Sequence, residues 1–153
     1  SYTNDQKILD QIHSDLRRAR ETAGLVAARH GLEAIAVAEL REIDVGGWAG
    51  LSRAEVESRF PDAFRRWVGG GEGWEGGETY PQMAARVLAA LQRIAAAHPD
   101  GRVLVVSHGG PIRAVHAAAA EMGVHAYRRL HMVEPNARVS AVAVEEGRIT
   151  PID

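Results

Sequence analysis

The segment that most constrains the fold is the stretch Val103 to Arg113, VLVVSHGGPIR. Four aliphatic residues that favour β structure come first, and a Gly-Gly-Pro turn follows, with Pro111 suited to the first position of a helix. The pattern predicts a strand that runs directly into a helix, with His108 at the junction. Ligands of open α/β sheets gather beyond the carboxyl ends of strands, so this histidine lies where a binding site is expected.

Helix patterns occur on both sides of this segment. Apolar residues recur at helical spacing before Gly31, a natural stop, and two capping boxes mark further helix starts. The predicted helices cover residues 14–29, a short segment after Ser52, a segment opened by Pro61 that turns Phe64 and Trp67 inward, residues 79–98 and residues 111–121. Strands alternating with such helices predict an α/β sheet covered on both faces.

Strand patterns are shorter and less certain in their limits. Residues 33–40 predict one strand, and residues 137–150 predict two terminal strands joined at Glu146-Gly147. Residues 8–13 fit either a short strand, which we favour, or a backward extension of the first helix. Six glycines between residues 69 and 77 predict a mobile loop, in which Trp74 either stacks on a ligand or anchors the loop.

Composition limits the class of protein. The chain has 153 residues, 46% of them hydrophobic, which predicts a single domain over residues 1–153. A net charge of −2 with no long charged block argues against a nucleic-acid partner, and no apolar run is long enough to span a bilayer. The absence of cysteine excludes disulfides and thiolate sites. We therefore expect a soluble cytoplasmic protein that binds a small, neutral or anionic molecule.

The start of the helix after His108 is a candidate anion pocket. Free N–H groups and the positive end of the helix dipole favour an anion there, and Arg113 adds a guanidinium. The alternative is that His108 only forms a hydrogen bond to a neighbouring loop.

Four motifs, in order, resemble those of the histidine phosphatase superfamily, also called phosphoglycerate mutase-like. SDLRRARETA, from Ser14, resembles its S-x-L-x-R-A-x-x-T-A signature, and LREIDVGGWAG resembles its L-x-E-x-x-x-G-x-W-x-G segment. GGETY and SHGGPIR resemble its G-E-S/T segment and its second-histidine motif. The motifs and their spacing cover nearly all of Ser14 to Asn136, which makes the resemblance specific.

The resemblance implies roles for particular residues. Arg18, His108 and Gly109 would contact the transferred phosphoryl group, and Glu42 would be the general acid that protonates the leaving oxygen. These residue types suit the chemistry, because a phosphoryl group in its transition state needs positive or donor groups around it when no metal is present. Without the motif, a surface glutamate paired with a neighbouring arginine, Arg41 or Arg53, would be the better interpretation of Glu42.

Glu78 and Thr79 occupy the position of the family's substrate-contacting loop. Thr79 also has a sufficient structural role as a helix cap. The implied ligand is a small phosphorylated metabolite or inorganic phosphate, with no cofactor and no metal. The implied fold is a three-layer sandwich with a mostly parallel central sheet flanked by helices.

One element of the family is not found in this sequence. The family's first strand ends in an Arg-His-Gly whose histidine accepts the phosphoryl group, and it lies beside the strand that ends at the second histidine. The only such triplet here, Arg29 to Gly31, follows a helix and fits a helix terminus. The first strand and the helix after it are therefore expected to be missing. A free sheet edge would follow, so we expect a homodimer, a swapped assembly or a part of a longer protein.

Several functions are compatible with these observations. The leading interpretation is a phosphate monoester hydrolase or a phosphomutase, acting without metal through a phosphohistidine in complete family members. The alternative is a non-catalytic phosphate-binding or interaction module, a pseudophosphatase. A metal site formed by His108, His116, His125 and His131 is disfavoured because no H-E-x-x-H pattern joins them. A dinucleotide site is disfavoured because G-x-G-x-x-G is absent.

Overall fold

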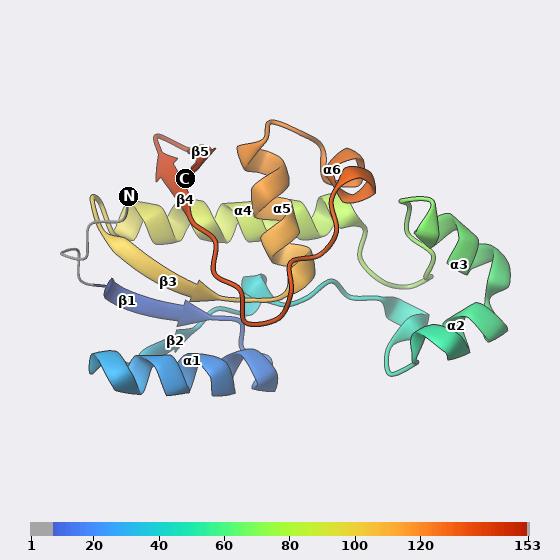
Figure 1. Cartoon of the computed structure of the whole chain (residues 1–153), viewed down its shortest axis with the longest axis horizontal. Helices are drawn as coiled ribbons and strands as arrows, with labels where there is room; N and C mark the ends of the chain where they lie inside the picture. The colour runs from blue at the N-terminus through green and yellow to red at the C-terminus, as the bar shows by residue number, and fades with distance from the viewer. Residues whose placement is uncertain (1–7, 153) are drawn as a thin grey trace.

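A parallel sheet forms the centre of the computed structural model, which describes residues 8–152 (Figure 1). Its strand order is β2 (Ala34–Ala36), β1 (Ile8–His13), β3 (Arg102–Val106). β1 pairs with both neighbours and aligns Gln11 with Ala34 on one side and with Leu104 on the other. Residues 8–13 are therefore a strand, and it is the central one of this sheet.

Helices cover both faces of the sheet, as predicted. α1 (Arg17–His30) covers one face, whereas α4 (Tyr80–Ala97) and α5 (Gly109–Ala119) lie on the other (Figure 1). α1 approaches closely because it turns alanines inward, and Gln11 Nε2 donates to Ala23 O at 2.8 Å. α1 ends where Gly31 adopts a φ of 64°, a conformation that glycine allows without strain. The three-layer α/β architecture is confirmed.

Three boundaries differ from the prediction. The strand predicted over residues 33–40 is only β2, followed by a single 3-10 turn, η1 (Ala38–Leu40). The reason is that β2 has only β1 to pair with: Val37 N donates to His13 O at 2.8 Å, and β1 ends there. α5 begins at Gly109, so Pro111 is its third residue. α6 (Val124–Leu130) was not predicted, because its N-cap, Gly123, has no capping side chain.

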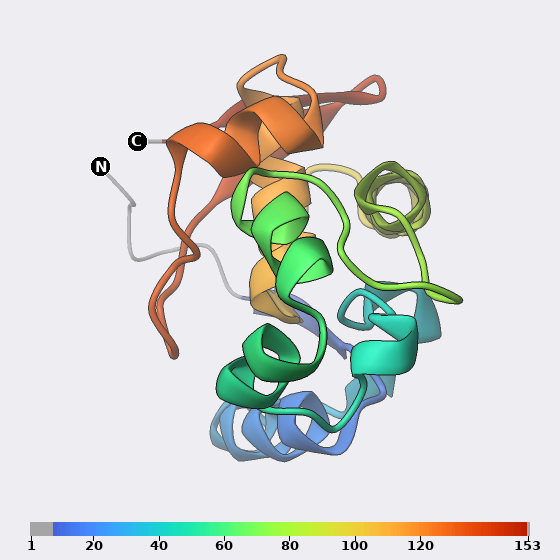
Figure 2. The ribbon, with the colours of Figure 1, turned by 90° about the vertical axis from the view of Figure 1, so that its right-hand side faces the viewer.

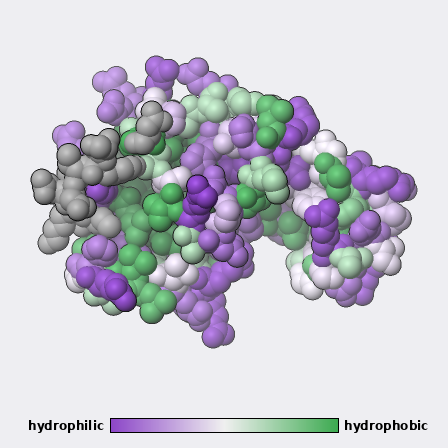
Figure 3. Space-filling model, in the orientation of Figure 1, coloured by the Kyte–Doolittle hydropathy of each residue, from purple (hydrophilic) through white to green (hydrophobic). Residues whose placement is uncertain are grey.

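The main sheet ends at β3 within the described part of the chain. β4 (Val142–Glu145) and β5 (Arg148–Pro151) are the two predicted terminal strands, but they form a separate antiparallel hairpin. Residues 11–13 of β1 are buried, whereas every residue of β3 is only half-buried. Figure 3 shows hydrophobic side chains gathered over these two strands. The outer edge of β3 thus has no partner strand among residues 8–152.

An arm formed by residues 46–79 extends beyond the carboxyl ends of the strands (Figures 1 and 2). It contains η2 (Gly46–Trp48), α2 (Arg53–Arg59), α3 (Pro61–Val68) and the glycine-rich loop. Both predicted capping boxes are present, at the starts of α2 and α4, and Phe64 is buried while Trp67 is half-buried.

The glycine-rich loop packs against η2 within the arm. Trp74 is 9% exposed, lies edge-on to Trp48 with ring centroids 5.5 Å apart, and donates from Nε1 to Glu78 O at 2.9 Å. A side chain at Gly73 would overlap the Trp48 ring, so the close approach requires glycine. Trp74 therefore anchors the loop. Between residues 8 and 152, no helix is both long and apolar enough to cross a membrane.

Candidate active site

His108 is the residue between β3 and α5, where the sequence placed it. It is 7% exposed, and its Nε2 lies 2.8 Å from Ser14 Oγ. Ser14 follows β1 and is fully buried, and its N–H donates to Val106 O at 2.9 Å. The parallel pairing of β1 and β3 therefore brings the ends of two strands, 94 residues apart in sequence, into contact. His108 therefore lies at a strand end as predicted, and Ser14 orients its imidazole.

The surroundings of His108 favour its neutral form. Burial lowers the pKa of His108 below 6.5, and the charge of Arg18 lowers it further. The carboxylate of Glu42 acts in the opposite direction, and Arg86 adds to the lowering. These influences place Arg18 and Glu42 within electrostatic range of the histidine, as the motifs implied.

Arg18 is the second residue of α1 and is exposed. Its carbonyl accepts a hydrogen bond from Thr22 Oγ1 at 3.0 Å, while its guanidinium has no ion pair within residues 8–152. The two acidic residues nearest in sequence have other partners: Asp15 forms a two-pronged bond at 2.6 Å with Arg41, and Glu21 pairs with Arg17. Arg41 accordingly lowers the pKa of the Asp15 carboxyl. The positive charge of Arg18 therefore remains available for an anion.

Glu42 is half-buried against the first turn of α5. Its Oε1 accepts from Ile43 N at 2.9 Å and its Oε2 accepts from Gly110 N at 3.2 Å. A side chain at position 110 would overlap the Glu42 carboxylate and displace it from this position. Neither Arg41 nor Arg53 pairs with Glu42: Arg41 binds Asp15, and Arg53 lies over the Phe64 ring. The surface ion-pair interpretation is therefore wrong.

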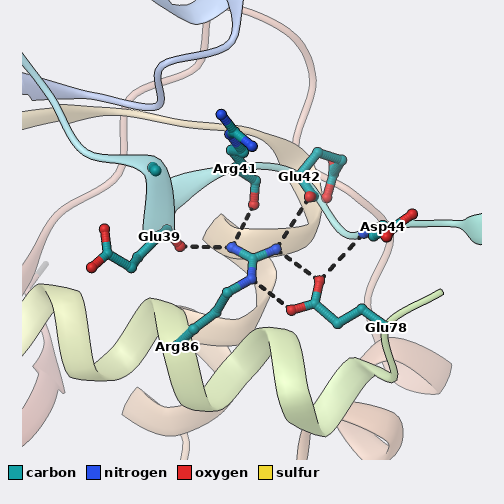
Figure 4. A pocket seen from close by; sticks show the side chains of 7 residues that line it. Glu39, Arg41, Glu42, Asp44, Glu78 and Arg86 are labelled. Carbon is teal, nitrogen blue, oxygen red and sulfur yellow. Dashed lines mark hydrogen bonds and ion pairs between the residues drawn. The ribbon is translucent and has the colours of Figure 1, made fainter.

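Arg86, on α4, holds the loop that carries Glu42 (Figure 4). Its Nε and one Nη2 hydrogen bind the two carboxylate oxygens of Glu78, at 2.6 and 2.8 Å. Its other three N–H groups donate to the backbone carbonyls of Glu39, Arg41 and Glu42, at 2.6, 2.8 and 3.1 Å. All five guanidinium donors are therefore used. The hollow drawn in Figure 4 has this saturated arginine inside it, so Arg86 positions Glu42 and has no donor left for a ligand.

The remaining sequence-predicted residues have structural partners. Besides Arg86, Glu78 accepts from Asp44 N at 3.3 Å, and Thr79 Oγ1 accepts from Gln82 N at 3.2 Å as the cap of α4. Gly109 lies at the start of α5, with Val133 packed against it. Contact of Glu78 or Thr79 with a substrate, and of Gly109 with phosphate, stays a prediction.

The other histidines lie apart from His108. His116 Nε2 lies 2.8 Å from Ser140 Oγ, His125 Nδ1 lies 2.9 Å from Gly70 O, and His131 stacks on Tyr127. No group of three or more His, Cys, Asp or Glu side chains is arranged for a metal ion within residues 8–152. The triplet at residues 29–31 ends α1 with exposed Arg and His side chains, as expected of a helix terminus.

The structure thus joins three of the predicted residues and adds two. Arg18, His108 and Glu42 come together from α1, the end of β3 and the loop after η1. Ser14 had been noted only as part of a motif, although its place at a strand end was a usable signal. Arg86 carried no sequence signal, because its partners lie eight to 47 residues away. The combination is an unpaired cation, a buried histidine and a carboxyl group, which suits binding a phosphoryl group and protonating its leaving oxygen.

Comparison with known proteins agrees with this geometry. The chain is 36% identical over 121 residues to phosphoglycerate mutase-like protein 4 of Arabidopsis thaliana, covering 76% of this chain and 53% of the relative. It is 35% identical over 143 residues to phosphoserine phosphatase 1 of Hydrogenobacter thermophilus, covering 92% and 67%. The chain therefore spans about half to two thirds of the length of these relatives.

A solved structure of mycobacterial glucosyl-3-phosphoglycerate phosphatase in complex with inorganic phosphate superposes with a TM-score of 0.81. It is 30% identical, and the match covers 94% of this chain and 74% of that one. The sequence model of the histidine phosphatase superfamily (branch 1) matches residues 2–152. With its motifs, its fold and its site in agreement, this chain belongs to the histidine phosphatase superfamily.

Proposed function

We propose that this chain forms the phosphate-binding and acid-bearing part of a metal-independent phosphomonoesterase that acts on a small phosphorylated metabolite. Arg18, His108 and the backbone of Gly109 bind the phosphoryl group, and Glu42 protonates the leaving oxygen. The observation that carries the proposal is the bond to the Glu42 carboxylate from Gly110 N, two residues after His108, which holds an acid at the first turn of α5.

The electrostatics of the site support this assignment. Negative charge spreads over the equatorial oxygens of a phosphoryl group as it is transferred, and the unpaired guanidinium of Arg18 offsets it. A bound phosphate also supplies the negative charge that His108 lacks, which raises the pKa of the imidazole and lets it donate to a phosphoryl oxygen. A phosphomutase would need the same three groups, so the geometry supports either reaction.

The covalent step of the family requires a further histidine beside the phosphoryl group. Within residues 8–152 the other strand-end histidine is His13, which is 2% exposed with its Nδ1 2.6 Å from Ser14 O. It is not placed for in-line attack by that buried nitrogen. This observation keeps a second candidate function, a non-catalytic phosphate-binding module, in the proposal.

Hydrolysis of p-nitrophenyl phosphate by the full-length native protein, in the presence of EDTA, tests the proposal. We expect turnover that His108→Ala or Arg18→Gln abolishes. His116→Ala on α5 and Arg20→Gln on α1 are matched controls that retain it, because neither contacts the site. Phosphate binding without turnover would favour the non-catalytic module, and neither binding nor turnover would overturn both.

The proposed assembly is a homodimer or a swapped assembly in which another chain pairs with the outer edge of β3. The support is that this edge has no partner strand among the described residues, and unpaired strand edges are prone to pairing. Light scattering coupled to gel filtration tests it. A dimer whose β3 amides are protected from hydrogen exchange is expected, and a monomer at all concentrations contradicts it.

A further inference from the structure

We propose that Ser14 is a positioning residue whose hydroxyl group fixes His108 in the tautomer that carries its hydrogen on Nδ1, and that Nδ1 is the nitrogen that donates to the phosphoryl group. This role deepens the proposed function and rests on it for the identity of the ligand, an oxyanion of the phosphate class. The evidence is the different surroundings of the two ring nitrogens of His108 and the complete burial of Ser14.

The main chain of Ser14 is fixed on both sides of its side chain. Its N–H donates to Val106 O at 2.9 Å, at the end of β3. Its carbonyl accepts from Nδ1 of His13 at 2.6 Å, and His13 is itself 2% exposed. These two bonds hold Oγ in place without using it. Replacing Ser14 by alanine therefore removes the hydroxyl group and leaves both main-chain bonds.

The Ser14 hydroxyl group has one hydrogen to donate, and a single acceptor for it. Within residues 8–152 its Oγ accepts from Leu16 N at 3.3 Å and lies 2.8 Å from His108 Nε2. Leu16 N cannot accept, and Ser14 is 0% exposed, so bulk water does not reach the hydroxyl group. The Ser14 O–H therefore donates to Nε2. If Nε2–H donated to Oγ instead, a buried hydroxyl hydrogen would have no acceptor, which is unfavourable.

Nδ1 of His108 has the opposite surroundings. Because Nε2 accepts, the hydrogen of the neutral ring lies on Nδ1. Nδ1 has no partner within residues 8–152, and it is not one of the fully buried side-chain atoms in that range that lack a partner. Solvent therefore reaches Nδ1, and a bound oxyanion can reach it as well.

The tautomer matters because the surroundings of His108 favour the uncharged ring. Burial and the charge of Arg18 lower the pKa of His108. An uncharged ring with its hydrogen on Nε2 would turn the lone pair of Nδ1 toward a phosphoryl oxygen, and the two would repel. With the hydrogen on Nδ1, His108 donates to that oxygen both when it is neutral and when it is protonated. Ser14 thus keeps a donor directed at the ligand in either charge state.

A second serine–histidine pair is the matched control. His116 Nε2 lies 2.8 Å from Ser140 Oγ, the same separation as in the pair of Ser14 and His108. Ser140 is exposed, so water can accept its hydroxyl hydrogen and either tautomer of His116 can form. The burial of Ser14 is therefore the feature that selects one tautomer of His108.

¹⁵N NMR of the ligand-free, full-length protein at pH 8 tests this role. Ring-nitrogen resonances distinguish a protonated from an unprotonated nitrogen, and the signals lost in His108→Gln assign them. We expect a protonated Nδ1 in the wild type, a shift toward the Nε2–H form in Ser14→Ala, and no change in Ser140→Ala. The Nε2–H form in the wild type overturns the proposal, even where Ser14→Ala does not fold. An unchanged tautomer in a folded Ser14→Ala overturns it as well.

The affinity for sulfate gives a second readout that a purely structural role would not change. Sulfate is a tetrahedral dianion whose charge is constant between pH 5.5 and 8. At pH 8, calorimetry should show Ser14→Ala binding sulfate about tenfold or more weakly than the wild type, the effect of one lost charge-assisted bond. The ratio should fall toward one as the pH falls to 5.5, because a protonated ring has hydrogens on both nitrogens.

The other charged groups that act on the ring are the same in both proteins and cancel in this ratio. They are Arg18 on α1, Glu42 on the loop after η1 and Arg86 on α4. An affinity ratio that does not change with pH overturns the proposal. If the wild type binds neither sulfate nor inorganic phosphate, the proposed function fails, whereas the tautomer is still read from the ligand-free spectrum. The two failures are therefore distinguishable.

Discussion

Two arginines close to Glu42, Arg86 and Arg113, have opposite surroundings. Arg86 uses all five of its donors, on Glu78 and on three carbonyls of the Glu42 loop, whereas Arg113 uses none within the described residues. Both are partly buried and both lie near the same acid. The difference teaches that an arginine with every donor satisfied holds the fold, while one left unsatisfied beside a candidate acid is available to a ligand.

The largest effect is expected at the acid that both arginines approach. Glu42→Gln keeps one oxygen, which can accept from either the Gly110 or the Ile43 N–H group, but it is no acid and has no proton to transfer. We expect turnover of p-nitrophenyl phosphate by the full-length protein to fall by roughly 10²- to 10⁴-fold, the usual contribution of a general acid. The affinity for inorganic phosphate should change little. Unchanged turnover would show that Glu42 is not the acid.

Replacing Arg86, whose donors are all used, should destabilise the fold. Arg86→Met removes the donor to three backbone carbonyls and the charged partner of Glu78, whose carboxylate keeps only Asp44 N, and we expect a loss of about 2–4 kcal/mol in the free energy of unfolding. Arg93→Met is the matched control on the same helix: its ion pair with Glu39 is exposed, so it should change stability by no more than about 0.5 kcal/mol. Urea unfolding measures both. A similar effect for the two variants would refute the assignment of Arg86 as the residue that holds the Glu42 loop.

Thr79→Ala tests the N-terminal cap of α4, the helix that carries Arg86. Loss of the bond from Gln82 N should destabilise the protein by about 1 kcal/mol. Thr79→Ser keeps an oxygen that can cap the helix and should restore stability. If Thr79 also contacts the substrate, Thr79→Ala will raise KM beyond what the stability change explains, and that result would support the implied substrate-loop role.

Arg113→Met should behave in the opposite way to Arg86→Met. Because Nε of Arg113 is buried without a partner and Arg128 lies nearby, replacing the charge should leave the ligand-free protein unchanged or more stable by about 1 kcal/mol. Thermal unfolding without ligand measures this. A clear loss of stability would mean that Arg113 has a structural partner and would remove the contrast with Arg86.

The smallest effect is expected from pH. The pKa of His108 is lowered by burial and by Arg18, so its stabilising contribution is present above pH 6.5 and is lost as the pH falls through the folded-state pKa. The pKa of His98 is raised by the Ile94 carbonyl and then by Asp10, so its contribution is present below pH 6.5 and is lost as the pH rises.

Urea unfolding between pH 5.5 and 8 measures how the free energy of unfolding depends on pH. His108→Gln should remove the loss of stability on acidification. His98→Gln should remove the loss of stability that occurs as the pH rises. Phosphate at saturating concentration should weaken the loss of stability on acidification, because a bound anion raises the pKa of His108. An identical pH dependence with and without phosphate would indicate that the anion binds elsewhere.

Local rules were sufficient for most of the elements. The boxes at Ser52 and Thr79 begin helices, and Gly31 ends one, because each satisfies backbone groups within a few residues. Residues 33–40 show where such rules stop. Their alternation is typical of a strand, but the strand can only be as long as its neighbour, and β1 ends at His13. α6 was missed because its start has no side-chain signal.

The sequence by itself determined the α/β class, the placement of His108 at the end of a strand, and the candidacy of Arg18 and Glu42. These depend on periodicity, turn residues and short motifs, all of which act over a few positions. Only the tertiary structure decided which groups are satisfied. Arg86 reaches carbonyls more than 40 residues away, and Arg113 meets no acid that could pair with it in residues 8–152. Hydrogen bonds between distant segments form only when the chain packs, so the difference between Arg86 and Arg113 could not be predicted from the sequence.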